Sequence, residues 1–179
     1  MARPLRHPVA VSLIGAALAA LTLSVYPLGA DGATAAAMTA VLVVLAAIDL
    51  EQRIIPNRIV VPAIVILLAA RVATFPARGP EFALAALAAG AAFLAPNLLS
   101  RRAMGMGDVK LAAMLGAGLG WGVIGAVCAA FLAVFPFGLA ALARGGLKAR
   151  TATLPFAPFL ALGGFVVLVV PHLLAAGSA

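Results

Sequence analysis

Two aspartates, Asp49 and Asp108, stand at positions where a carboxyl group could carry out catalysis. The chain of 179 residues has only five acidic residues. Asp49 ends an apolar run, and Asp108 follows Gly105-Met106-Gly107 and precedes another such run. An ionisable group at the end of a membrane segment is costly, so each is a functional candidate. Two carboxyl groups brought together could share a proton and activate a water molecule.

Each aspartate also has a purely structural interpretation. Asp49 could pair with Arg53 one helical turn later, and Asp108 could cap the N-terminus of the helix that follows it. The glycines before Asp108 would let a substrate strand approach the backbone closely. A nucleotide-binding loop is not indicated, because neither a preceding strand nor a following Lys-Ser/Thr pair is present. The two residues taken singly leave these alternatives open.

The composition is that of a membrane protein, with 65% hydrophobic and 9% charged residues. A membrane-spanning helix needs about 20 mostly apolar residues. We therefore predict an all-α polytopic membrane protein with six to seven transmembrane helices, one of them short, forming a single domain over residues 1–179. The expected spans are 9–28, 33–50, 59–75, 81–99, 109–119, 122–143 and 156–174.

The distribution of Lys and Arg predicts how these spans are oriented, because cytoplasmic loops collect basic residues. Without a break, residues 109–143 would form a helix of about 52 Å in a hydrocarbon core of about 30 Å. With a break at residues 118–122, ten of the twelve basic residues lie on one side, leaving Arg71 and Arg78 near the other. The N-terminus and both candidate aspartates then face the cytoplasm, and Asp31 and Glu81 fall in short outer loops. The ten are Arg3, Arg6, Arg53, Arg58, Arg101, Arg102, Lys110, Arg144, Lys148 and Arg150.

Several other functions are disfavoured by the residues available. The net charge of +7 is scattered between apolar runs without a basic stripe, so nucleic-acid binding is not expected. Cys128 is the single cysteine, which excludes a disulfide within the chain. His7 and His172 are predicted at opposite membrane faces and cannot share a metal ion. We therefore expect no cofactor and no metal site.

Three segments together resemble the type IV prepilin peptidases, a family of intramembrane aspartyl proteases with a Gly-x-Gly-Asp motif. The first is Asp49 followed by Ile55-Pro56-Asn57, and the second is Gly105-Met106-Gly107-Asp108-Val109-Lys110-Leu111. The third is 154–163, Leu-Pro-Phe-Ala-Pro-Phe-Leu-Ala-Leu-Gly, in which the family usually has glycine at the position of Ala157.

The resemblance implies that Asp49 and Asp108 form the catalytic pair. It also implies supporting roles for the neighbouring motif residues, namely Pro56, Asn57, Gly105, Gly107, Lys110, Pro155, Phe156 and Pro158. The family cleaves basic cytoplasmic leaders from prepilins or pseudopilins, before a hydrophobic segment, at the bacterial inner membrane. We expect a short, peptidase-only form as in tight-adherence (Flp) pilus systems, without the N-terminal zinc domain associated with methyltransferase activity. The partners are then a prepilin and membrane lipid, while the oligomeric state is not predicted.

Two charged neighbours and one further function stay as alternatives. Lys110 could be an interfacial charge that extends to the membrane surface, or it could adjust the aspartate pair. Glu51 could attract a basic leader or be an ordinary solvated charge. A small proton- or cation-coupled transporter or assembly subunit would also place Asp49 and Asp108 at helix ends.

Overall fold

The computed structural model describes residues 7–99, 105–145 and 155–177, and these residues are almost entirely helical. Seven α-helices follow one another along the chain in the described segments. They are α1 (Pro8–Val25), α2 (Ala30–Gln52), α3 (Asn57–Thr74), α4 (Gly79–Leu99), α5 (Met106–Leu119), α6 (Val123–Gly145) and α7 (Ala157–Gly177). Two short 3-10 turns, Pro76–Arg78 and Gly120–Gly122, connect α3 to α4 and α5 to α6.

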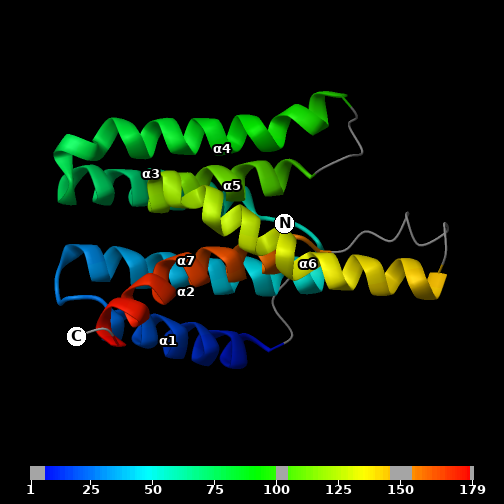
Figure 1. The fold of residues 1–179 in the computed structure, drawn as a ribbon, viewed down its shortest axis with the longest axis horizontal. Coiled ribbons are helices and arrows are strands. Elements are labelled where there is room, and N and C mark those ends of the chain that lie inside the picture. The colour runs from blue at the N-terminus through cyan, green and yellow to red at the C-terminus, as the bar shows by residue number, and fades with distance from the viewer. Residues whose placement is uncertain (1–6, 100–104, 146–154, 178–179) are drawn as a thin grey trace.

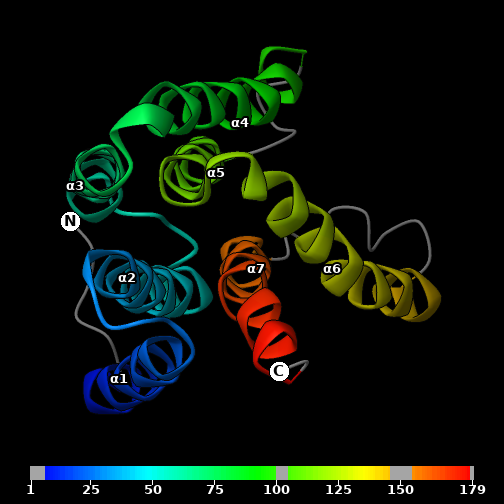
Figure 2. The ribbon, with the colours of Figure 1, turned by 60° about the vertical axis from the view of Figure 1, so that its left-hand side comes forward.

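Consecutive helices run in opposite directions (Figure 1). The C-terminal ends of α2, α4 and α6 therefore lie at the same face of the bundle as the N-terminal ends of α1, α3, α5 and α7. The groups α3, α4, α5 and α1, α2, α7 lie on opposite sides in that view, and α6 crosses at an angle. Figure 2 shows α7 between α2 and α6. The end of α2 and the start of α5 consequently meet at one face.

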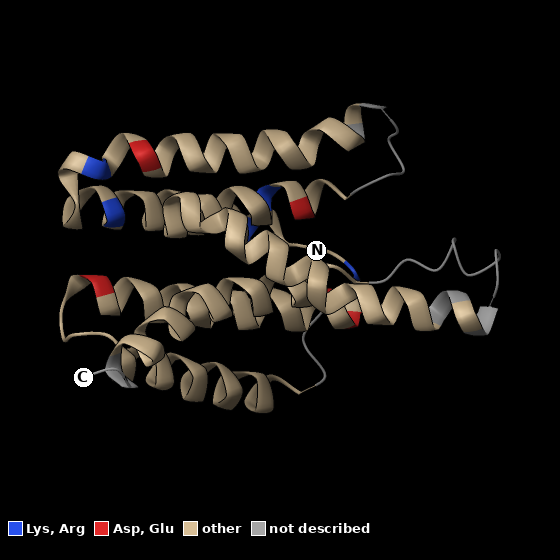
Figure 3. Cartoon of the chain, viewed as in Figure 1, with Lys and Arg blue, Asp and Glu red and all other residues tan. Residues whose placement is uncertain are grey.

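The helices agree with the predicted spans and confirm an all-α polytopic membrane protein. Six helical stretches are long and apolar enough to cross a membrane when 106–140 is counted as one. The described charged residues lie near helix ends (Figure 3). The expectation that Asp31 and Glu81 occupy loops is wrong, since both lie in the first turn of a helix, α2 and α4 respectively. An acidic residue there is favoured by the helix dipole. Arg3, Arg6, Arg101, Arg102, Lys148 and Arg150 lie outside the described residues, as does the side chain of Arg144.

The predicted break after the short fifth helix is confirmed. The helix α5 has 14 residues and ends at Leu119, and the next residue, Gly120, has a φ of 58°, which only glycine adopts readily. The chain then reverses, and α6 runs antiparallel to α7, with Gly122 near Val167 and Phe131 near Phe156. The stretch 106–140 is therefore two helices of opposite direction.

The buried core is centred on α2, α5 and α7. Its large, fully buried side chains include Leu42 and Leu45 from α2, Leu111 and Leu115 from α5, and Leu160 from α7. Apolar packing of this kind fixes helices relative to one another because each buried side chain fills a defined space. The core thus sets the relative position of the two helices that carry the candidate aspartates.

Candidate active site

Asp49 lies in the last turn of α2 and is 7% exposed. Its Oδ2 accepts a hydrogen bond from the backbone N–H of Ala157, at 3.2 Å. Ala157 is the first residue of α7, whose N-terminal N–H groups carry the positive end of a helix dipole. The negative end of the α2 dipole disfavours the Asp49 carboxylate. The positive end of the α7 dipole, at Ala157, favours it.

Asp108 lies in the first turn of α5 and is half-buried. The residue that caps this helix is Gly105, so the interpretation of Asp108 as the N-cap is wrong. The helix already begins at Met106, which makes Asp108 its third residue. Its carboxyl group lies against the backbone N–H of Gly105.

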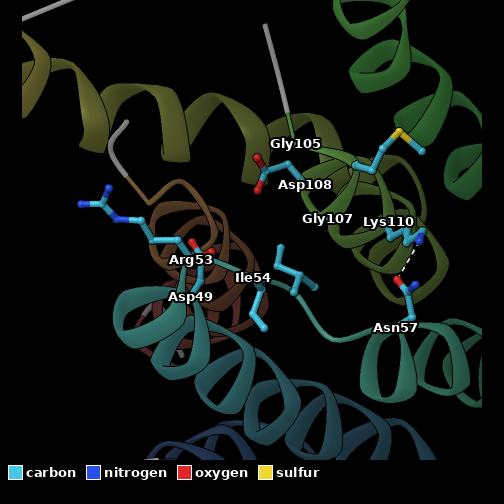
Figure 4. Close-up of a pocket in the computed structure, with 10 residues that line it drawn as sticks. Asp49, Arg53, Ile54, Asn57, Gly105, Gly107, Asp108 and Lys110 are labelled. Carbon is cyan, nitrogen blue, oxygen red and sulfur yellow. Dashed lines mark hydrogen bonds between the residues drawn. The ribbon is translucent and has the colours of Figure 1, made fainter. Parts of the chain in front are cut away.

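The two aspartates line one open pocket of about 360 Å³ at the face where α2 ends and α5 begins (Figure 4). They approach closely enough for the charge of Asp49 to act on Asp108. They are 59 positions apart in the sequence, and separate helices deliver them to the same space. The two carboxyl groups therefore face one pocket and interact electrostatically across it.

The short loop between α2 and α3 forms another wall of the pocket. Arg53 ends α2 with φ of 53°, a left-handed conformation that turns the chain sharply. Ile55 then packs against Gly107, where a Cβ atom would lie 2.9 Å from the Ile55 Cβ. The second glycine of the Gly-x-Gly-Asp segment is therefore required by the close approach of this loop.

A polar contact joins the first two motifs at the edge of the pocket. Lys110 Nζ donates a hydrogen bond to Asn57 Oδ1 at 2.6 Å (Figure 4). Asn57 is the first residue of α3, and Pro56 before it is the N-cap. Lys110 is thus directed to the site, and its contribution to the aspartate pair stays a prediction.

The third motif, residues 154–163, contributes to the site mainly by positioning the start of α7. Pro155, Phe156 and Pro158 belong to the described residues but do not line this pocket. The Phe156 ring lies 5.4 Å from that of Phe131 and 6.2 Å from that of Phe93, which anchors the start of α7 to α6 and α4. The contribution of this segment to the pocket is the N–H of the buried Ala157.

Four further residues line the pocket but were not predicted as site residues, although all except Ile54 lie in or beside the segments singled out in the sequence. The four are Arg53, Ile54, Ile55 and Met106. The role of the Ala157 N–H was not predicted either, since a backbone donor does not depend on residue type. Only the three-dimensional approach of α7 to α2 shows it.

The fold and the site define a multi-pass helical membrane protein with paired aspartates in a pocket at one face. Residues 36–143 match the model of the type IV leader peptidase family. Because this match covers more than half of the chain, the protein belongs to the type IV leader peptidase family. The membership of this family, predicted from the three motifs, is confirmed.

Curated relatives agree with this assignment. The chain is 34% identical over 173 residues to proteins named "Prepilin leader peptidase/N-methyltransferase" from Burkholderia pseudomallei strains 1026b and K96243. The alignment covers 91% of this chain and 54% of those proteins, so the chain spans about half their length. No solved structure matches it significantly.

Proposed function

We propose that this protein is a prepilin leader peptidase in which Asp49 and Asp108 hydrolyse the peptide bond that ends the leader. The observation that carries the proposal is the convergence of both carboxyl groups on one open pocket, in a chain of the type IV leader peptidase family. The relatives bear the name of this activity. No comparable observation favours the transporter alternative.

The mechanism follows from two carboxyl groups that cannot easily both be ionised. The ionised group takes a proton from a water molecule held between the pair. The protonated group donates a hydrogen bond to the scissile carbonyl oxygen, so that the water oxygen attacks a polarised carbon. Proton transfer to the leaving amine then releases the leader. The Ala157 N–H holds the Asp49 carboxyl group in place through these steps.

We further propose that the pocket opens to the cytoplasm at the bacterial inner membrane, with a prepilin or pseudopilin as substrate. The basic residues of the pocket end, Arg53, Arg58 and Lys110, support this orientation. The exposed Glu51 beside Asp49 suits a basic leader by its charge. Lipid surrounds the apolar helices, and the peptidase domain extends over residues 1–179.

The test is co-expression with a prepilin, followed by intact-mass analysis of the prepilin N-terminus. The wild-type protein should remove one defined leader, and Asp49→Asn and Asp108→Asn should each abolish cleavage. Glu81→Gln, an acid-to-amide change near the start of α4 at the opposite face, is the matched control and should retain cleavage. Cleavage by either aspartate variant, at normal membrane levels, would contradict the proposal.

A further inference from the structure

A second hollow lies on the lipid-facing side of α1, α2 and α7. It has a volume of about 370 Å³ and is lined almost wholly by apolar side chains. These three helices lie side by side in Figures 1 and 2. Leu50 and Leu162 at its rim are 61% and 49% exposed, so it is open from the side. We call this hollow the α1/α2/α7 groove.

The described residues that line the groove offer no free polar side chain to an occupant. Thr39 is the single polar residue among the described lining residues. The Thr39 hydroxyl donates a hydrogen bond to the Ala35 carbonyl oxygen at 3.0 Å. It also shares a hydrogen bond with the Thr22 hydroxyl at 3.1 Å. The binding chemistry of the groove is therefore that of an apolar surface, which suits a hydrophobic chain that lies within the bilayer.

Two of the helices that line the groove, α2 and α7, also form the Asp49–Ala157 hydrogen bond near one end of the groove. On α2, Ala46 and Leu42 lie three and seven residues before Asp49, which places them on the same helix stripe. On α7, Ala161 lies four residues after Ala157 and one turn further along. The groove therefore begins about one helical turn from Asp49, and no described residue lines both the groove and the aspartate pocket.

The length of the groove matches a substrate that enters the membrane. Its α2 wall runs from Leu50 to Thr39, which corresponds to a rise of about 16 Å along a helix. This is about half of the hydrocarbon thickness of a bilayer. A polypeptide cut beside Asp49 could continue along this wall as a helix for about three turns.

We infer that the α1/α2/α7 groove binds the apolar helix that follows the scissile bond of the substrate. This inference rests on the proposed peptidase function. The pocket at the membrane face then holds the cleaved bond, while the groove holds one side of the substrate helix and sets the depth at which the bond is presented. The groove is thus a determinant of affinity for membrane-embedded substrates, separate from the chemistry.

The first experiment compares two leucine-to-tryptophan variants on two substrates. Leu162→Trp fills the groove, whereas Leu87→Trp on α4 places the same ring on a lipid-facing surface, where Leu87 is 71% exposed. The substrates are a full prepilin in detergent and a short peptide that spans the scissile bond but ends before the apolar helix. Leu162→Trp should lower kcat/KM for the full prepilin about tenfold through KM, because the apolar contact is lost. It should leave the short peptide unaffected, and Leu87→Trp should change neither.

The second experiment is disulfide crosslinking in a Cys128→Ala, Asp108→Asn background. Leu162→Cys should crosslink to single cysteines on one face of the prepilin helix, and Leu87→Cys should not. Equal behaviour of both tryptophan variants on full prepilin, or crosslinks at Leu87→Cys alone, would overturn the inference and assign the groove to lipid. An equal loss on both substrates would also overturn it. Failure of the wild type to cleave either substrate would instead reject the peptidase function itself.

Discussion

Lys110 on α5 donates a hydrogen bond to Asn57 at the start of α3, at 2.6 Å, and so ties together two segments that are distant in the sequence. This bond closes the side of the pocket opposite α7. Removing it by Lys110→Ala or Asn57→Ala should lower kcat about fivefold, since a hydrogen bond of this kind contributes about 1 kcal/mol. Steady-state cleavage of a prepilin at equal amounts of folded enzyme measures this loss.

A double-mutant cycle separates this bond from independent effects of its partners. The combined variant should lose no more than either single variant, because both remove one interaction. Arg58→Ala, the adjacent exposed basic residue on α3, is the control and should change kcat little. Additive losses for Lys110 and Asn57 would show that the two side chains act separately.

The backbone N–H of Ala157 can be removed by proline, whose ring Cδ takes the place of the amide hydrogen and faces Asp49 Oδ2. Because Ala157 is the first residue of α7, proline is compatible with its position and removes the donor to Asp49. Ala157→Pro should lower kcat at least about tenfold, as expected for the loss of a hydrogen bond to a charged group. Ala157→Gly keeps the N–H and should remain near wild type. Equal rates for both variants, with equal thermal stability, would remove the N–H from the mechanism.

The two glycines before Asp108 should respond differently to alanine. A Cβ at Gly107 would lie 2.9 Å from the Ile55 Cβ, whereas a Cβ at Gly105 would meet its nearest atom, Asp108 Oδ2, at 3.5 Å. Gly107→Ala should therefore displace the loop and reduce cleavage strongly, and Gly105→Ala should be tolerated better. Adding Ile55→Gly, which removes the Ile55 Cβ itself, to Gly107→Ala should restore part of the activity. The absence of any such rescue would contradict the steric explanation.

The sequence predicted the helices and the aspartate pair because both depend on patterns along the chain. Apolar runs and the distribution of basic residues were sufficient to place the break near Gly120 and to bring Asp49 and Asp108 to one face. The contacts that shape the pocket were not predictable in this way. Ala157 acts through its backbone, and Ile55 acts through its fit against Gly107. Such contacts depend on how α7 and the α2–α3 loop pack against their neighbours. No periodic pattern in the sequence encodes this packing.

The opposite face of the bundle contains an ion pair between a buried arginine and a partly exposed aspartate, which should contribute to stability. Arg71 is 6% exposed, pairs with Asp31 on α2, and donates through Nε to the Gly118 carbonyl oxygen at 2.7 Å. One guanidinium group thus joins α2, α3 and the end of α5. Arg71→Met should lower the free energy of unfolding by about 3 kcal/mol, because it leaves Asp31 without its partner. Thermal unfolding in detergent measures the change.

The pair of Arg78 and Glu81 provides a matched control near the same face. It has the same chemistry, but the Arg78 side chain is 58% exposed, so solvent screens the interaction. Arg78→Met should therefore change the unfolding temperature little. Equal unfolding temperatures for Arg71→Met and Arg78→Met would contradict the role assigned to burial, and restoration by Arg71→Lys would show that charge alone is sufficient.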